Sequence, residues 1–216
     1  HFILFKPKDI VSGDFTWATK VGDLLYLACC DSTGHGVPGA FMSLLNIGFL
    51  SEAIKERHIY KPGDIFNYVR DRLIETIGKD EQQDGFDGII LCVDSNTNNI
   101  TYAAANNAPL IVRDNETINL KCNKMPVGKG IKTDSFDTFV LSYQKNDSLY
   151  LFTDGYPDQF GGPKGKKFKY KQLEDLLIQN STINLNSQKE KLIETFENWR
   201  GDLEQVDDVC IIGIKL

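Results

Sequence analysis

The chain of 216 residues lacks the features of several large protein classes. It has no apolar run close to the roughly 20 residues that a transmembrane helix needs. It also shows no signal peptide, so we expect no membrane span within these residues and no secretion, although a longer protein that contains them could be tethered to a membrane. Basic residues are few, 24 Lys and Arg against 30 Asp and Glu, which gives a formal net charge of -6. Nucleic acid is therefore not an expected partner, because its binding requires basic surface that displaces counterions from phosphates.

Cysteine is also scarce, and its spacing argues against a disulfide framework or a zinc site. The five cysteines form no CxxC pair, and the apolar runs of the chain contain four of them: Cys29, Cys30, Cys92 and Cys210. A free cysteine in such a run behaves as a small hydrophobic residue. The expected location is therefore a reducing compartment, the cytoplasm.

The rest of the composition is that of a globular domain. Hydrophobic residues make up 41% of the chain and charged residues 25%, close to the average for folded proteins. There is no internal repeat and no low-complexity linker. We therefore expect a single domain over residues 1–216. Its abrupt apolar start, His1-Phe2-Ile3-Leu4, suggests a piece of a longer protein.

The pattern of apolar residues predicts an α+β fold with antiparallel sheets. We expect a polar loop at 80–85, strands at 24–30, 88–94, 99–105, 109–114, 135–142, 148–153 and 209–216, and helices at 38–57, 62–77, 171–179 and 187–200. Strands in hairpin-like runs and helices in pairs, without regular βαβ alternation, favour this class. One apolar stripe of the first helix is expected to face the core: Phe41, Leu44, Leu45, Ala53 and Ile54.

Four short segments place aspartate at the edge of an apolar or strand-like run. SGD, CCDSTGHG, LFTDG and QVDDV contain Asp14, Asp31, Asp154 and the pair Asp207 and Asp208. A single aspartate of this kind is most often a turn former or a helix cap. The runs before Asp31 and Asp154 are predicted core strands, however, so their carboxylates emerge from the same buried layer.

If these carboxylates converge, their mutual repulsion would raise their pKa values unless cations lie between them. Oxygen ligands suit hard ions such as Mg²⁺ or Mn²⁺. Two such ions, roughly 3.5–4 Å apart, can activate a shared water molecule and neutralise charge on a phosphoryl group. Composition and spacing leave open whether the aspartates converge.

Several longer motifs indicate a resemblance to a known family. SGDF and DSTGHGVPGAFMS, followed in order by AANNAPLIV, MPVG, FTDGYPDQFG and DDVCIIGI, resemble SpoIIE/RsbU-type phosphatases of the protein phosphatase 2C (PPM) superfamily. The resemblance covers essentially the whole chain and implies an αββα sandwich, two central antiparallel sheets flanked by helices. It further implies a metal-dependent serine/threonine protein phosphatase of bacterial signalling, which hydrolyses phosphoserine or phosphothreonine by a metal-activated water.

The resemblance also implies a site with two Mn²⁺ or Mg²⁺ ions. Its catalytic and metal-binding aspartates would be Asp14, Asp31, Asp154 and Asp207. Asp31 would bridge both ions, and Ser32 would contribute its backbone carbonyl. Asp208 would be a neighbour of the site or an outer metal ligand.

Two features depart from the family pattern. Cys210 stands where a hydroxyl residue is usual, and no counterpart exists for the phosphate-binding arginine near the N-terminus of many eukaryotic relatives.

The implied substrate is a phosphorylated protein, such as a STAS-domain anti-sigma factor antagonist. An upstream sensory or dimerising domain would regulate this C-terminal catalytic part. We expect the helices near 37–57 and 62–77 to form a switch that controls metal occupancy.

Other features have plainer interpretations. His35, between two glycines, is expected to be structural, because hard-metal sites favour oxygen ligands. A Ser-His-Asp hydrolase that uses Ser12 or Ser32 has no GxSxG elbow to support it. The basic cluster is expected to be a solvated loop: Lys164, Lys166, Lys167, Lys169 and Lys171. The remaining alternative is a non-catalytic regulatory docking module with the same fold, although every expected aspartate is present.

Overall fold

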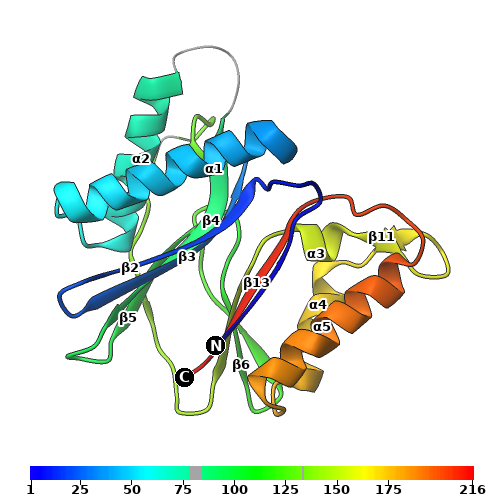
Figure 1. Ribbon diagram of the computed structural model, residues 1–216. Coiled ribbons are helices and arrows are strands. Elements are labelled where there is room, and N and C mark those ends of the chain that lie inside the picture. The colour runs from blue at the N-terminus through cyan, green and yellow to red at the C-terminus, as the bar shows by residue number, and fades with distance from the viewer. Residues whose placement is uncertain (78–83, 133) are drawn as a thin grey trace.

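Two antiparallel sheets form the centre of the computed structural model, which describes residues 1–77, 84–132 and 134–216 (Figure 1). The first sheet has the strand order β1 (Phe2–Lys6), β13 (Val209–Lys215), β10 (Ser148–Phe152), β6 (Leu110–Arg113) and β7 (Glu116–Asn119). The second has the order β2 (Asp14–Val21), β3 (Leu24–Ser32), β4 (Gly85–Asp94), β5 (Ile100–Ala105) and β9 (Phe139–Leu141), with β8 (Val127–Gly128) paired to β4. Most of the predicted polar loop at 80–85 lies outside the described residues.

Helices cover the outer face of each sheet (Figure 1). α1 (Gly36–Ser51) and α2 (Pro62–Ile77) lie over the second sheet, and α4 (Tyr170–Asn180) and α5 (Leu185–Arg200) lie over the first. A short helix, α3 (Gly155–Asp158), and the hairpin of β11 (Phe160–Gly161) and β12 (Lys166–Lys167) connect β10 to α4. The layers follow the order helix, sheet, sheet, helix, which confirms the predicted αββα sandwich.

Apolar side chains fill each junction between these layers. Phe66 belongs to the cluster between the second sheet and its helices, and Phe196 belongs to the corresponding cluster of the first sheet. Ile89 and Ile212 meet in a third cluster between the two sheets. The central strands are therefore buried on both faces, which explains why their sequences read as continuous apolar runs.

The inner face of α1 differs from the predicted apolar stripe. Phe41 and Leu44 are 69% and 67% exposed, whereas Ser43 and Asn46 are buried. The first half of α1 crosses the backbone of two turns rather than an apolar surface, and Gly39 allows the close approach. Buried backbone groups in those turns require polar partners, which apolar side chains cannot supply. The stripe prediction was therefore wrong for Phe41 and Leu44, whereas Leu45 packs partly buried against the apolar cluster of the second sheet.

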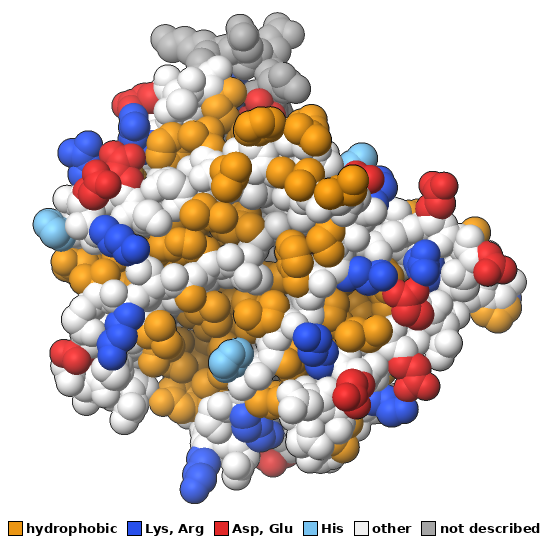
Figure 2. Space-filling view, in the orientation of Figure 1, with side chains coloured by type: hydrophobic (Ala, Val, Ile, Leu, Met, Phe, Trp, Pro, Cys, Tyr) orange, Lys and Arg blue, Asp and Glu red, His pale blue; other side chains and the backbone are white. Residues whose placement is uncertain are grey.

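The second half of α1 agrees with the prediction. The helix continues through a π-helical turn, η1 (Glu52–Glu56), in which Ala53 and Ile54 are buried. By length and composition alone, Gly36–Glu56 could cross a membrane. In this fold, its Phe49 and Leu50 belong to the apolar cluster of the second sheet. Figure 2 shows further apolar side chains gathered on the outer surface over α1.

Candidate active site

Three aspartates form a row across three neighbouring strands of the second sheet. Asp14 begins β2 and pairs with Asp31 near the end of β3. Asp31 pairs in turn with Asp87 near the start of β4. Side chains at paired positions of antiparallel strands share a face and lie close together, and like charges there repel. The row therefore needs protons or a cation to relieve this repulsion.

The first sheet adds carboxylates from the segments at its strand ends. Asp154 follows β10 after one intervening residue, Thr153, and Asp207 lies shortly before β13. The Thr153 hydroxyl donates a hydrogen bond of 2.6 Å to the carboxylate of Asp14 and so connects the two sheets. The charges of Asp154 and Asp207 both act on Asp31. All four aspartate-bearing segments that the sequence singles out thus meet in one place.

Burial and mutual repulsion change the acidity of this cluster. Burial raises the pKa of Asp31 to about 10, with further contributions from the neighbouring charges, Asp14 first among them. Burial likewise raises the pKa of Asp14 well above its usual range. Burial and the charge of Asp207 raise the pKa of Asp154. The cluster therefore carries more potential negative charge than its surroundings compensate.

Three of the carboxylates, those of Asp31, Asp87 and Asp207, face a cleft of about 450 Å³. Its walls are formed by Asp31, Ser32, Thr33, Gly34, His35, Phe86, Asp87, Asn106, Pro126 and Asp207. In the described part of the chain, these walls include no lysine or arginine. Lys8 and Lys124 lie just outside: the Lys8 Nζ is 3.3 Å from the His35 Nε2, and the Lys124 Nζ donates a 3.1 Å bond to the carbonyl of Asn106. Two lysines thus lie at the edge of the cleft, and the charge of Lys124 acts to lower the pKa of Asp87.

Asp208 has a different environment from its neighbour Asp207. Its two carboxylate oxygens accept hydrogen bonds of 2.8 Å each from the backbone N–H groups of Lys8 and Gly13. These bonds fix the segment that leads into β2. Gly13 is sterically required there, because a Cβ atom would lie 2.2 Å from the carbonyl oxygen of Gly34.

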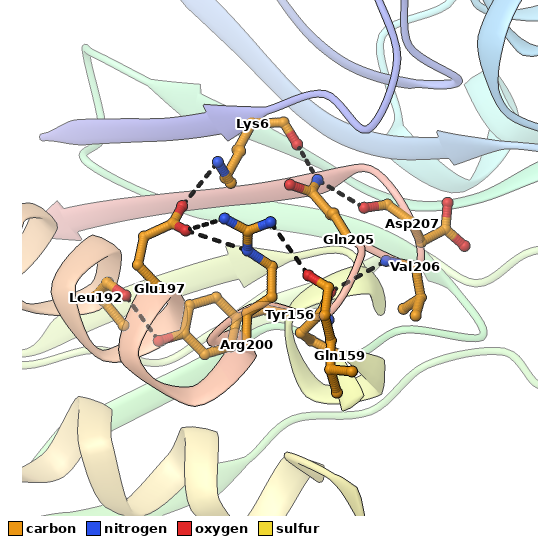
Figure 3. A network of polar contacts seen from close by, with 10 residues as sticks. Lys6, Tyr156, Gln159, Leu192, Glu197, Arg200, Gln205, Val206 and Asp207 are labelled. Atoms are coloured by element: carbon orange, nitrogen blue, oxygen red, sulfur yellow. Dashed lines mark hydrogen bonds and ion pairs between the residues drawn. The ribbon is translucent and has the colours of Figure 1, made fainter. Parts of the chain in front are cut away.

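Two glutamine side chains hold the loop that carries Asp207 (Figure 3). The Gln205 side chain donates bonds of 2.8 Å to the carbonyl oxygens of Lys6 and Asp207. The buried Gln159 accepts a bond of 3.1 Å from the backbone N–H of Val206. It also donates a 2.9 Å bond to the carbonyl of Glu204. The backbone at Asp207 is therefore held in place by the protein itself.

His35 and Ser32 lie at the edge of the carboxylate cluster. The His35 Nδ1 is 3.0 Å from the carboxylate of the exposed Asp9. The Ser32 hydroxyl accepts a 3.0 Å bond from the side chain of Asn46 in α1. The structural role of His35 and the carbonyl ligand at Ser32 both stay predictions.

The donor atoms of the cluster suit a hard divalent cation. Among residues 1–77, 84–132 and 134–216, no three His, Cys, Asp or Glu side chains are grouped closely enough to enclose an ion as they stand. The carboxylates nevertheless act electrostatically on one another. They supply only oxygen, the ligand that Mg²⁺ and Mn²⁺ prefer. The residues present therefore fit such a cation.

Comparison with known proteins assigns the chain to a family. A model of the family described as stage II sporulation protein E (SpoIIE) matches residues 22–216. The chain belongs to this family. Among solved structures, the SpoIIE-family chain is similar to the SiaA-PP2C domain of Pseudomonas aeruginosa, with 26% identity and a TM-score of 0.90 over 100% of this chain and 85% of that one.

Two further structures share the fold at lower identity. One contains the PP2C phosphatase domain and a fragment of the regulatory domain of SpoIIE from Bacillus subtilis (16% identity, TM-score 0.77, 99% of this chain and 62% of that one). The other contains the RsbU and RsbW domains of a Mycobacterium tuberculosis protein (19% identity, TM-score 0.77, 99% of this chain and 58% of that one). Comparison with curated proteins gives no match. The SpoIIE-type phosphatase resemblance and its fold are thereby confirmed.

Two residues of this SpoIIE-family site were missed by the sequence analysis. Asp87 completes the row of aspartates, and the Asn106 side chain donates a 2.8 Å bond to its carboxylate. Burial raises the pKa of Asp87, and this bond opposes the increase. A signal was present, because Asp87-Gly88 repeats the aspartate–glycine pattern of Asp154 at the edge of an apolar run.

Proposed function

We propose that this SpoIIE-family chain is a metal-dependent serine/threonine protein phosphatase. The observation that carries the proposal is the row of Asp14, Asp31 and Asp87, which meets Asp154 and Asp207 from the other sheet. Clustered carboxylates that outnumber the nearby protein cations are suited to metal ions, and such ions can in turn bind a phosphoryl group. The family and the PP2C-type fold support the same reaction class.

Four aspartates would hold two Mn²⁺ or Mg²⁺ ions, together with the Ser32 carbonyl: Asp14, Asp31, Asp154 and Asp207. When bound, such ions polarise a phosphoryl oxygen and lower the pKa of a water molecule that can attack phosphorus. Asp31 has a cross-strand partner on each side in the row, which supports its proposed place between the ions. Phosphate would leave without forming a bond to the protein.

Other side chains of the chain would hold these carboxylates in position. The Thr153 hydroxyl orients Asp14, and Asn106 orients Asp87. Asp208 would position the segment before Asp14 rather than bind an ion, because both of its oxygens already accept backbone N–H bonds. Such prior arrangement reduces the reorganisation required when substrate binds.

The proposed substrate is a phosphoserine or phosphothreonine on a signalling protein. The two solved structures of lower identity combine their phosphatase-type domains with a regulatory fragment or an RsbW domain. By analogy, we propose an upstream regulatory region for this chain and a partner such as a STAS-domain protein. The five free cysteines support a cytoplasmic location.

The exposed face of α1 is the surface that we propose for the upstream regulator. Val37, Phe41 and Leu44 are 61%, 69% and 67% exposed on this helix. The helix begins at Gly36, only five positions after Asp31. A regulator bound to this face could therefore shift the turn that carries a proposed metal ligand, which supports the predicted switch.

Phosphate release from short phosphopeptides tests the proposed function. The protein is treated with EDTA, and Mn²⁺ or Mg²⁺ is then added with phosphoserine, phosphothreonine or phosphotyrosine peptides. We expect metal-dependent hydrolysis of the first two peptides and a loss of about 100-fold or more in Asp154→Asn. Asp202→Asn, which changes an exposed aspartate, is the matched control. If the metal-loaded protein hydrolyses none of the peptides, the docking-module alternative is favoured.

A further inference from the structure

Helix α1 meets the candidate site through a buried polar face. Gly39, Ser43 and Asn46 follow one another at spacings of four and three residues, so they lie on one side of the helix. All three are buried. The contact is close: a Cβ atom on Gly39 would lie 2.1 Å from the carbonyl oxygen of Gly34 and 2.9 Å from the Cα of Gly13. The helix therefore rests directly on the two turns that present the proposed ligands from β2 and β3.

Ser43 and Asn46 connect these two turns. The Ser43 Oγ is 2.5 Å from the carbonyl oxygen of Gly13 and 3.2 Å from the Oγ of Ser32. The Asn46 Nδ2 donates a 3.0 Å bond to the same Ser32 oxygen. The Gly13 carbonyl also accepts a 3.1 Å bond from the Ser32 N–H. Each of the two turn residues directly adjoins an aspartate that we propose to bind metal.

One buried atom of this polar face lacks a hydrogen-bond partner in the described part of the chain. Asn46 is fully buried, and its Oδ1 has no hydrogen-bond partner in the described part of the chain. A buried acceptor without a partner costs free energy that an apolar side chain of similar size would avoid. Leu50, one turn further along, shows that the same face accepts an apolar residue away from the site. The position of Asn46 over the two turns is therefore better explained by its hydrogen bond to Ser32 than by a contribution to stability.

We propose that Ser43 and Asn46 are positioning residues that set the separation of the Asp14 and Asp31 turns, and through it the affinity for divalent metal. This inference rests on the proposed function. A displacement of about 1 Å at a reacting group can cost about 100-fold in rate, so a small change in this separation is consequential. Side chains behind metal ligands typically change metal affinity by about 10- to 100-fold when they are removed.

Mn²⁺ binding measured by electron paramagnetic resonance tests the proposal without depending on activity. Ser43→Ala and Asn46→Leu should each weaken Mn²⁺ binding about tenfold. Ser43→Thr, which keeps the hydroxyl, should stay close to wild type. In metal-free protein, amide hydrogen exchange at Ser32 should accelerate in both weakened variants, because Ser43 holds the Gly13 carbonyl that accepts from the Ser32 N–H and Asn46 holds the Ser32 side chain.

Leu50→Ala is the matched control on the same helix face. It should lower the stability of the fold but leave the Mn²⁺ dissociation constant unchanged, since Leu50 belongs to the apolar cluster of the second sheet. Equal Mn²⁺ affinity in wild type, Ser43→Ala and Asn46→Leu would overturn the positioning role and leave the phosphatase proposal intact. A loss of affinity in Leu50→Ala as large as theirs would also overturn it. If the wild type binds no Mn²⁺ and hydrolyses no phosphopeptide, the proposed function and this inference fail together.

Discussion

Replacing Asp31 with asparagine should stabilise the metal-free protein while it abolishes the proposed activity. Asp31 has a pKa of about 10 in the folded chain, chiefly because it is buried. An aspartate in an unfolded chain has a pKa of about 3.9. The folded state therefore holds the proton more tightly. Asp31 therefore contributes to the free energy of unfolding below pH 4. This contribution is lost as pH rises toward 10, at about 1.36 kcal/mol per pH unit.

The size of the effect at neutral pH follows from these values. Between the unfolded pKa of about 3.9 and pH 7 lie about three units, which sets an upper limit of about 4 kcal/mol. Neighbouring carboxylates share the repulsion and can take up the proton instead, so we expect a gain of about 2 kcal/mol in Asp31→Asn. Asparagine is neutral at every pH, so it removes the free-energy cost of burying an ionised carboxylate at this position.

Urea unfolding after EDTA treatment, at pH 6, 7 and 8, measures this difference. The wild type should lose stability across the series, and Asp31→Asn should lose less. Asp202→Asn removes an exposed charge of the same sign and should follow the wild type. Mn²⁺ at about 100 times its dissociation constant should stabilise the wild type and Asp202→Asn by about 2.7 kcal/mol but leave Asp31→Asn unchanged. The reasoning is refuted if metal-free Asp31→Asn is no more stable than the wild type at pH 8.

Three further predictions concern other parts of the molecule. Cys210→Ala should retain most activity, and rapid-quench mass spectrometry should detect no phosphoenzyme, because this thiol is fully buried; a phosphocysteine would contradict direct attack by water. Phe41→Ala, on the exposed face of α1, should change the free energy of unfolding by less than about 0.5 kcal/mol in urea. A change above 2 kcal/mol would place it in the core after all. Arg113→Ala should lower the free energy of unfolding, because Asp147 is buried and accepts bonds of 3.0 and 2.7 Å from this guanidinium. Arg113 lowers the pKa of Asp147, so this loss should shrink as pH falls below 4, and a cost that does not change with pH would speak against the ion pair.

The sequence predicts the buried elements of the fold better than its edges. The strand at 209–216 and the helix at 62–77 stand out because each buries a continuous run or a regular stripe. β1 and β7 were not predicted, since they are short outer strands of their sheet and half of their side chains face away from the core. β2 was not predicted either, because its exposed positions make its pattern irregular.

The candidate site shows where local patterns stop being informative. Asp14 and Asp31 were identified by motif, but their direct pairing depends on strand register, which spacing does not determine. Asp87 joins them only through that register. The inner face of α1 was predicted from hydrophobicity, yet the helix packs on backbone turns there, so buried Ser43 replaces the expected Phe41.

The central claim is that the convergent aspartates form a metal-dependent phosphatase site. The most direct test is to measure bound Mn²⁺ and phosphate release from a phosphoserine peptide in the same EDTA-treated samples of wild type and Asp31→Asn. We predict two Mn²⁺ ions per wild-type chain, with hydrolysis that rises as they bind. In Asp31→Asn, both the binding and the hydrolysis should be lost. Undiminished hydrolysis by the wild type in EDTA, or wild-type turnover in Asp31→Asn, would contradict the claim.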